Sequence, residues 1–318
     1  MLFHTYDSAP AETELYDIAV LAGGDSAERQ ISVASGHRVA GALEEFGHQV
    51  AVFDPEDADL FGINWNEFDA CFIALHGGAG EDGRIQVQLE ELCVPYTGSG
   101  PVTSRLALSK SATKDRLHRC GVSTPPHFSF HKTDSLPKIL ARVRRLGFPL
   151  IVKPDGQGCS LGVTVADDAD SLAESIEAAG RFESYLLAEQ TITGREFTVA
   201  VIDRQPLPAL EIIHPCRTFD YDLKYGAEAV RHEFPDDEAA STAQQTAVAA
   251  ADALGTRGLV RVDLITDREG QAWVLEVNTI PGMTTHSLAP LAAAQAELSM
   301  PQFCDRLVRL CLPQAIVV

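Results

Sequence analysis

The sequence predicts an α/β protein of three domains, the first of which contains a parallel sheet. Short apolar runs alternate with helical patterns over the first hundred residues, which is typical of parallel strands joined by helices. From Arg195 onward the pattern changes to longer strands and a hairpin, which indicates a mixed α+β arrangement. We therefore predict domains at 1–100, 101–194 and 195–318.

In the first domain, apolar runs predict buried strands at residues 17–21, 50–53 and 70–75. A helical pattern extends between the first two of them, from Ala27 to Phe46. The first and third strands lead directly into glycine turns, which begin at Gly23 and at His76. Because functional residues of parallel sheets collect at the carboxyl ends of strands, we expect part of a site at these two turns.

A turn-rich stretch at 96–101 marks the first domain boundary. After it we predict a helix from Ser104 to about Gly121. The other elements of the central domain are predicted as strands at 127–130, 150–153, 163–165 and 185–189, and as helices from 135 and 171. In the third domain we predict strands at 196–202 and 210–213, a helix over 239–254, a hairpin around 270 and a helix from 302.

The composition excludes several classes of partner. Forty-five acidic and 25 basic residues give a net charge of −20, which repels phosphate backbones and anionic lipid surfaces. The N-terminus resembles no secretory signal, and no apolar run reaches the roughly 18 residues of a membrane span. The seven cysteines never form a C-x-x-C pair, which favours reduced thiols over a zinc site. We expect a cytoplasmic protein that binds neither nucleic acid nor membrane, although one local basic pocket can still bind a nucleotide.

The predicted hairpin around Gly270 carries the strongest chemical signal. If its loop has four residues, Asp263 lies opposite Glu276, and Arg261 lies opposite Asn278. All four side chains then project from one face of the sheet. Facing carboxylates repel each other without a cation, and carboxylate and amide oxygens are ligands that Mg²⁺ prefers. The alternative is a hairpin without a metal, in which Asp263 pairs with Arg261 and Glu276 is solvated.

Two loops offer binding groups for anions. Lys153 ends an apolar strand directly before the glycine-rich stretch 154–162, where the backbone can approach phosphates and the lysine can supply charge. This stretch lacks the Gly-Lys-Ser/Thr of a Walker A loop, so a flexible hairpin loop is the alternative. After the metal hairpin, the amide of Gly282 and the hydroxyl of Ser287 can donate to a carboxylate.

Lys110 and His76 can each be explained without a role in binding or catalysis. A lysine within a helix, as predicted for Lys110, is usually solvated. His76 can ligate a metal or act as a base, but a histidine beside glycines is more often a hydrogen-bonded loop residue.

Taken in order, the motifs resemble those of the D-alanine:D-alanine ligases of the ATP-grasp superfamily. The resemblance covers residues 17 to about 294, and all motifs occur in the family's order: GGDSAERQIS (23–32), HGGAGEDG (76–83), PYTGSG (95–100), VKP (152–154), GREFTV (194–199), YDLKY (221–225), RVD (261–263) and LEVNTIPGMTTHSL (275–288). It implies a three-domain ATP-grasp fold whose central and C-terminal domains clamp ATP. It also implies a homodimer and a role in peptidoglycan precursor synthesis.

The resemblance also implies roles for individual residues. ATP would be bound by Lys110, Lys153, Ser160, Glu189, Gln190, Ile192, Glu196 and Lys224. Two Mg²⁺ or Mn²⁺ ions would be held by Asp263, Glu276 and Asn278. The first D-alanine would contact Glu28 and His76, and the second would contact Ser287 and Leu288. Arg261 and the Gly282 amide would form an oxyanion hole, and Tyr225 would lie beside Lys224 on a loop that closes over the site.

Two residues depart from the family pattern. Cys159 stands where the family usually has the serine that links Tyr225 to Glu28, and a thiol is the weaker hydrogen-bonding group. Val87 replaces a usual glycine. The first departure leaves open a ligase of other small amino acids, or a nucleotide-binding homologue that has lost activity. The Lys224-Tyr225 pair favours an amine acceptor over a hydroxy acid.

Overall fold

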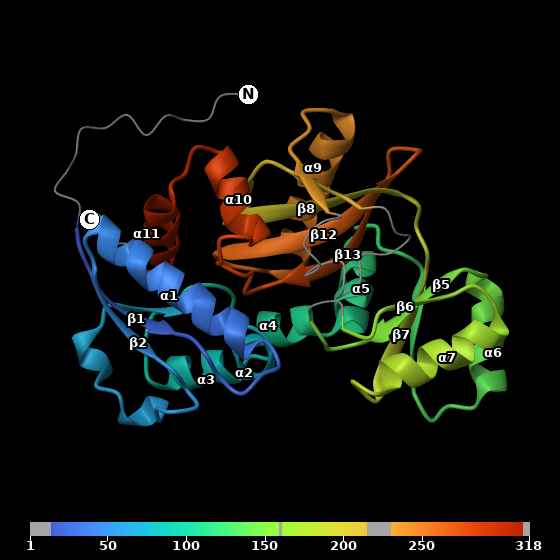
Figure 1. Ribbon diagram of the computed structural model, residues 1–318, viewed down its shortest axis with the longest axis horizontal. Helices are drawn as coiled ribbons and strands as arrows, with labels where there is room; N and C mark the ends of the chain where they lie inside the picture. The colour runs from blue at the N-terminus through green and yellow to red at the C-terminus, as the bar shows by residue number, and fades with distance from the viewer. Residues whose placement is uncertain (1–13, 159–160, 215–229, 314–318) are drawn as a thin grey trace.

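The computed structural model describes residues 14–158, 161–214 and 230–313, which form an α/β protein with three sheets. The first sheet is parallel with strand order β2-β1-β3, and the second is antiparallel with order β4-β7-β5-β6. The third has the order β11-β10-β8-β12-β13, with β9 beside β8. Figure 1 shows the first two sheets at opposite ends of the long axis, with the third between them.

The strands agree with the predicted ones to within a few residues. They are β1 (Asp17–Leu21), β2 (Gln49–Phe53), β3 (Ala70–Ile73), β4 (His127–His131), β5 (Leu150–Pro154), β6 (Thr164–Ala166), β7 (Tyr185–Gln190), β8 (Gly194–Ile202), β9 (Gln205–Pro206), β10 (Leu210–Ile213), β11 (Arg231–Glu233), β12 (Leu259–Asp267) and β13 (Ala272–Asn278). The short strands β9 and β11 were not predicted.

The helices are α1 (Arg29–Phe46), α2 (Gly78–Glu81), α3 (Arg84–Glu91), α4 (Pro101–Leu108), α5 (Lys110–Arg119), α6 (Leu136–Leu146), α7 (Ala169–Gly180), α9 (Glu238–Leu254), α10 (Leu288–Gln295) and α11 (Met300–Cys311), with 3₁₀ turns at Leu60–Gly62 and Trp65–Glu67. The single helix predicted from Ser104 to Gly121 is wrong. Ser109 adopts an extended conformation and caps α5, so two helices replace one. Within the described ranges, none of the helices has the length and apolarity that a membrane crossing requires.

The C-terminal helix belongs to the core of the first sheet. Phe303 and Leu307 of α11 are buried in the same apolar cluster as Ile18 and Leu43 from β1 and α1. In Figure 1, α11 lies beside α1 at the end of the molecule that holds the parallel sheet. We therefore propose the division into domains 1–100, 101–194 and 195–318 from the three sheets. In this division, α11 belongs to the third domain by sequence but packs against the first sheet.

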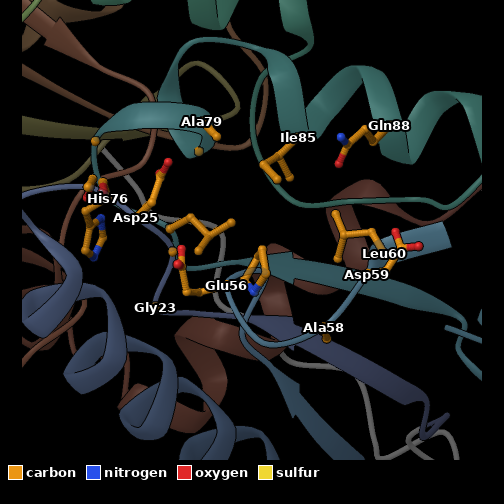
Figure 2. A pocket seen from close by; sticks show the side chains of 16 residues that line it. Gly23, Asp25, Glu56, Ala58, Asp59, Leu60, His76, Ala79, Ile85 and Gln88 are labelled. Carbon is orange, nitrogen blue, oxygen red and sulfur yellow. Dashed lines mark hydrogen bonds between the residues drawn. The ribbon is translucent and has the colours of Figure 1, made fainter. Parts of the chain in front are cut away.

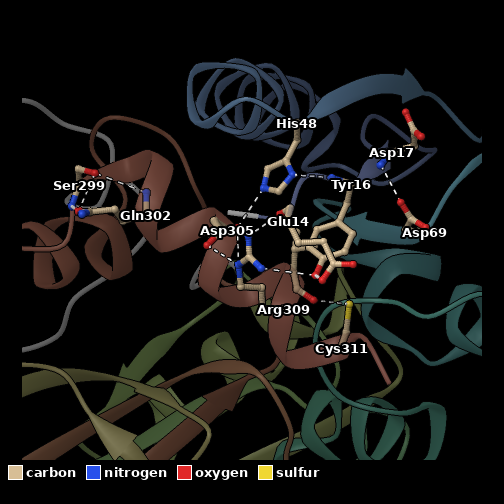
Figure 3. A network of polar contacts seen from close by, with 11 residues as sticks. Glu14, Tyr16, Asp17, His48, Asp69, Ser299, Gln302, Asp305, Arg309 and Cys311 are labelled. Atoms are coloured by element: carbon tan, nitrogen blue, oxygen red, sulfur yellow. Dashed lines mark hydrogen bonds and ion pairs between the residues drawn. The ribbon is translucent and has the colours of Figure 1, made fainter. Parts of the chain in front are cut away.

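A partly buried polar network ties α11 to this sheet (Figure 3). The ring of His48 accepts a hydrogen bond from the Tyr16 amide at Nδ1, 3.1 Å, so Nε2 carries the proton and donates to Asp305, 3.0 Å. Arg309 donates to the same carboxylate at 2.8 Å and to the Glu14 carbonyl at 2.8 Å. Every group of the network has a partner, which fixes the helix in one position.

The hairpin has the predicted pairs near the site, but its loop is longer than expected. Thr266 pairs with Ala272, so the loop contains the five residues 267–271 instead of four. A bulge at Leu275 then shifts the register by one residue. As a result Asp263 still faces Glu276 and Arg261 still faces Asn278, as predicted.

Candidate active site

A pocket between the second and third sheets brings together most of the residues that the sequence predicts to bind ATP and metal. Its wall contains eight of them: Lys110, Lys153, Glu189, Gln190, Ile192, Glu196, Asp263 and Glu276. Arg261, predicted for the oxyanion hole, and Leu288, predicted to contact the second D-alanine, also line it. Ile151, Ile212, Ile265 and Leu275 add an apolar surface. Such a pocket, apolar with a few convergent charges, suits a nucleotide whose base is apolar and whose phosphates are charged.

A buried carboxylate between two lysines forms the inner wall of the pocket. Glu189 at the end of β7 lies 2.5 Å from Lys153 Nζ on β5 and 2.7 Å from Lys114 Nζ on α5. Burial opposes the ionised form of Glu189, but the two lysines outweigh it and lower the pKa of Glu189 to about 2. The pocket wall therefore contains the ionised Glu189 carboxylate, and of its two lysine partners only Lys153 also lines the pocket.

Lys110 connects the glycine loop to the hairpin. Its ammonium donates to the Gln157 carbonyl at 2.6 Å and lies 3.4 Å from Glu276 Oε2. The side chain is 9% exposed, so the alternative of a solvated lysine is wrong. A phosphate in the pocket would meet this ammonium where the second and third sheets approach each other.

The hairpin carboxylates face each other but hold different cations. Asp263 accepts from Arg261 Nε and Nη2 at 2.9 and 2.8 Å, and from the Thr198 hydroxyl at 2.5 Å. Glu276 faces Lys110 instead. The Asp263–Arg261 pair that we considered as an alternative is thus present, beside a Glu276 that is not simply solvated.

The donor set at the hairpin fits Mg²⁺. No cluster of three or more acidic, histidine or cysteine side chains able to hold a metal occurs among the described residues. Asp263 and Glu276 supply two carboxylates and Asn278 an amide oxygen that now accepts from the Ile280 amide at 2.9 Å. Mg²⁺ commonly binds through one or two carboxylates and takes its remaining ligands from water and substrate phosphates.

Glu28 lies at the start of α1, where the first sheet meets the glycine loop. A Cβ at Gly158 would lie 2.6 Å from Glu28 Oε1, and one at Gly77 would lie 3.7 Å from its carboxyl carbon. Only glycine fits at 158 without displacing this side chain. Glu28 thus lies between two glycine-rich segments, one around Gly77 and the other around Gly158, that are far apart in sequence.

A second buried carboxyl group, Glu81, lies near Glu28. The pKa of Glu81 is raised to about 7, mainly by burial and next by the charge of Glu28. Lys110 and Arg261 oppose this shift. Near neutral pH Glu81 is therefore only partly ionised.

Replacing Glu81 by Gln is expected to stabilise the protein more at pH 8 than at pH 5. The pKa of Glu81 in the folded protein exceeds its ordinary value of 4.5. The wild type therefore loses stability as the pH rises from 4.5 through about 7, because Glu81 must ionise while buried, whereas Gln does not titrate. The shift corresponds to roughly 3 kcal/mol. Urea unfolding of both proteins at the two pH values measures it, with the exposed Glu91→Gln as control. An equal difference at both pH values would contradict the prediction.

The loop after β13 is anchored on the first sheet. His76 is buried, and its ring nitrogens lie 3.0 Å from the Ile280 carbonyl and 2.8 Å from the Ser35 hydroxyl. Ser35 also accepts from the Met283 amide at 3.1 Å, and Arg38 donates to the Met283 and Thr284 carbonyls. His76 thus has the hydrogen-bonded loop position that we weighed against a metal ligand. Its contact with substrate remains a prediction.

The predicted acceptor-binding residues lie on this anchored loop. The Ser287 hydroxyl bonds the amide and hydroxyl of Thr284, both at 2.9 Å. A Cβ at Gly282 would lie 2.7 Å from that hydroxyl, so a larger residue there would displace the Ser287 side chain. Leu288 begins α10 and reaches the pocket wall, whereas the lining of that pocket does not include Ser287 or Gly282.

A separate cavity lies at the carboxyl ends of β1, β2 and β3 (Figure 2). Asp25, Glu56 and Asp59 lie around it, together with His76 and Leu60. It has a volume of about 250 Å³. This position confirms the expectation that polar groups gather at the carboxyl edge of the parallel sheet, although Glu28 is not part of the cavity wall.

Four predicted residues lie outside the described part of the chain: Cys159, Ser160, Lys224 and Tyr225.

Sequence reasoning missed Lys114, Glu81, Ser35 and Arg38. Lys114 had a usable signal, because it lies one turn after Lys110 and one turn before Leu117, on the buried face of α5. Glu81 follows the glycine turn at a strand end, which was a weaker signal. Nothing local distinguishes Ser35 and Arg38, whose partners lie about 250 residues further along the chain.

Comparisons with known proteins agree with this geometry. A family model described as the C-terminus of D-Ala D-Ala ligase matches residues 117–309. A D-alanine–D-alanine ligase of Marinobacter nauticus is 41% identical over 304 residues, covering 94% of this chain and 92% of the relative. One from Pseudomonas syringae pv. tomato, named ligase B, is 42% identical over 288 residues, covering 90% and 89%.

Solved structures give the same result. A D-alanine–D-alanine ligase from Bacillus anthracis, complexed with ATP, superimposes with a TM-score of 0.82 at 29% identity, covering 93% of this chain and 97% of that one. A D-Ala:D-Ser ligase from Enterococcus faecalis has a TM-score of 0.82 at 27% identity, covering 94% and 100%. With its sheets, its pocket and these relatives in agreement, the chain belongs to the D-alanine–D-alanine ligase family, which has the ATP-grasp fold.

Proposed function

We propose that the protein joins two D-alanine molecules into D-alanyl-D-alanine, with conversion of ATP to ADP and phosphate. The observation that carries the proposal is the pocket in which Lys110 and Lys153 face the Asp263–Glu276 pair. Relatives named D-alanine–D-alanine ligase that match about nine-tenths of the chain support it. The dipeptide would serve peptidoglycan precursor synthesis.

ATP would lie along the pocket between the second and third sheets. Lys110 and Lys153 would contact its phosphates, because their ammonium groups are the lysine charges on the pocket wall. Glu189, Gln190, Ile192 and Glu196 would lie along the adenosine, and Ser160 and Lys224 would complete the phosphate contacts. Glu196 is held by His214 at 3.0 Å, so its carboxylate is oriented before a ribose hydroxyl arrives.

Asp263, Glu276 and Asn278 would hold two Mg²⁺ or Mn²⁺ ions. When bound, these ions neutralise the phosphate oxygens and so favour attack on the γ-phosphate. The protein contributes the position of the ligands. Thr198 and Arg261 orient the Asp263 carboxylate, and Lys110 lies beside Glu276.

The reaction would proceed in two steps. A carboxylate oxygen of the first D-alanine, whose ammonium lies near Glu28 and His76, attacks the γ-phosphorus, and the bond to ADP breaks. The amine of the second D-alanine, oriented by Ser287 and Leu288, then attacks the acyl carbon, and phosphate leaves as the amine loses a proton. Arg261 and the Gly282 amide would stabilise the tetrahedral oxyanion. Tyr225 on its loop and Cys159 beside Glu28 would complete the first-substrate side.

The net charge of −20 and the absence of C-x-x-C pairs support a cytoplasmic protein without nucleic-acid or membrane partners. The homodimer is carried over from the family resemblance. This assignment is part of the proposal.

The test is phosphate release with ATP, Mg²⁺ and a panel of amino acids. We expect D-alanine to stimulate release and to appear as a dipeptide, and D-serine as second substrate to be used less well. Phosphate release that no D-amino acid stimulates would refute the ligase assignment and favour a nucleotide-binding homologue. Preferred use of another small amino acid would instead change only the acceptor.

A further inference from the structure

The start of α5 and the root of the glycine loop are joined through one residue, Asp155. Its carboxylate accepts from the Ser109 hydroxyl at 2.7 Å and from the Ser111 amide at 2.8 Å. Its backbone carbonyl accepts from the Lys110 amide at 2.9 Å. Three hydrogen bonds thus connect a residue of the loop to the first turn of a helix that lies more than 40 positions earlier in the chain.

These bonds occupy the amide groups at the N-terminus of α5, which would otherwise attract an anion. The first amides of a helix lack partners within the helix, and its dipole favours negative charge at that end. In α5, Asp155 takes the amides of Lys110 and Ser111, and the Ser109 hydroxyl takes that of Ala112 at 3.3 Å. The helix N-terminus therefore binds the protein's own carboxylate, and the lysine side chain alone is left to face the pocket.

Lys110 contacts the first part of the loop at two points. Its amide is held by Asp155, and its ammonium donates to the Gln157 carbonyl at 2.6 Å. On the far side, the Gly156 amide donates to Glu183 at 2.7 Å. The position of the Lys110 ammonium relative to the loop backbone is thus set by its contacts with residues 155 and 157. The Asp155 carboxylate fixes the first turn of α5, from which the Lys110 side chain extends.

We propose that Asp155 is a positioning residue for the nucleotide phosphates, which it never touches. It holds residues 155–157 of the loop and the Lys110 ammonium at a fixed separation, so that both reach the phosphate chain at once. The proposal rests on the proposed function, in which ATP occupies this pocket. The Asp155 contacts therefore increase the affinity of the pocket for phosphate groups and leave its affinity for the nucleoside unchanged.

Asp155→Asn keeps the shape of the side chain but removes its charge and one acceptor. Charge-assisted hydrogen bonds are roughly twice as strong as neutral ones. We therefore expect the affinity for ATP and ADP to fall about tenfold, which is 1.4 kcal/mol, while the affinity for adenosine changes less than about twofold. Ser109→Ala removes one of the two bonds to the Asp155 carboxylate, together with the cap on the Ala112 amide, and should weaken ATP binding by a smaller factor of about three.

Asp168→Asn is the matched control. Asp168 caps α7 by accepting from the amides of Asp170 and Ser171 at 3.1 and 2.9 Å, and it touches no part of the loop. Its replacement removes the same kind of cap from the same region of the chain. We expect comparable loss of thermal stability in the two variants, but no change in ATP affinity for Asp168→Asn.

Calorimetric titration of ATP, ADP and adenosine with Mg²⁺ and without D-alanine separates the outcomes. Weaker binding of ATP and ADP with unchanged binding of adenosine supports the proposal. Equal affinity for ATP in the wild type and in both Asp155→Asn and Ser109→Ala overturns it, as does an equal loss for ATP and adenosine, which would indicate a structural role. If the wild type itself does not bind ATP, the proposed function fails, and this proposal fails with it.

Discussion

Replacing Asp263 by Asn is expected to lower kcat about a thousandfold or more. The substitution removes one of two facing carboxylates and leaves Glu276 with a neutral partner across the hairpin. A bound metal ion contributes several kcal/mol of charge stabilisation to a phosphoryl transfer, and each 1.36 kcal/mol is tenfold in rate. The variant also releases Arg261, whose two bonds to Asp263 hold its guanidinium in place.

The control for Asp263→Asn is Asp267→Asn at the end of the same strand. Asp267 accepts from the Trp273 indole at 2.7 Å and from the Gln271 amide at 2.8 Å, within the hairpin loop and away from the pocket. Steady-state kinetics over a Mg²⁺ titration should show normal kcat for this control. A kcat of Asp263→Asn within about threefold of wild type would show that the carboxylate has no role in the chemistry.

Replacing Glu189 by Gln is expected to destabilise the fold by about 3–5 kcal/mol. Glu189 balances Lys114, which is 0% exposed, and Lys153, which is 8% exposed. Without its charge two ammonium groups face each other in the interior. Exposed pairs contribute less than about 1 kcal/mol, so Glu177→Gln, which breaks the exposed pair with Arg181, is the control.

Acid should reduce the difference between Glu189→Gln and the wild type. The pKa of Glu189 in the folded state, about 2, lies below the ordinary value of 4.5, so its stabilisation is present above pH 4.5 and is lost as the pH falls toward 2. Urea unfolding at pH 7 and pH 3 measures this. A pH-independent difference, or one no larger than that of Glu177→Gln, would contradict the assignment of Glu189 as the buried counter-ion.

The hairpin shows how far a local pattern can predict a site. Alternation predicted that Arg261, Asp263, Glu276 and Asn278 share a face, and they do. The prediction assumed a short loop, whereas the real loop is longer by one residue and the bulge at Leu275 restores the pairing. A bulge has no signature in alternation, because it changes which residues face each other without changing their types.

Helices were harder to predict where they are short or end without a strong breaker. The break between α4 and α5 depends on the single extended residue Ser109, whose partner Asp155 lies in a distant loop. The helix α10 is rich in alanine and carries Pro290 in its first turn, and its uniformly apolar sequence has no amphipathic period. Tertiary contacts, and not local propensity, determine both elements.

The contacts that join the sheets could not be read from the sequence. Lys114 looks like any helical lysine until β7 brings Glu189 to it. Likewise, Ser35 and Arg38 meet the loop at 283–284 only because α1 covers that side of the first sheet. Local patterns predicted which residues carry chemistry, and the packing of the three sheets determines which of them meet.

The most direct test of the account follows oxygen atoms. If the first D-alanine carboxylate attacks the γ-phosphate, D-alanine labelled with ¹⁸O in its carboxylate should transfer one labelled oxygen to each phosphate released, in step with dipeptide formation. Mass spectrometry of the phosphate measures this. Dipeptide formation with unlabelled phosphate would contradict the acyl phosphate step, and unlabelled phosphate without dipeptide would contradict the ligase activity itself.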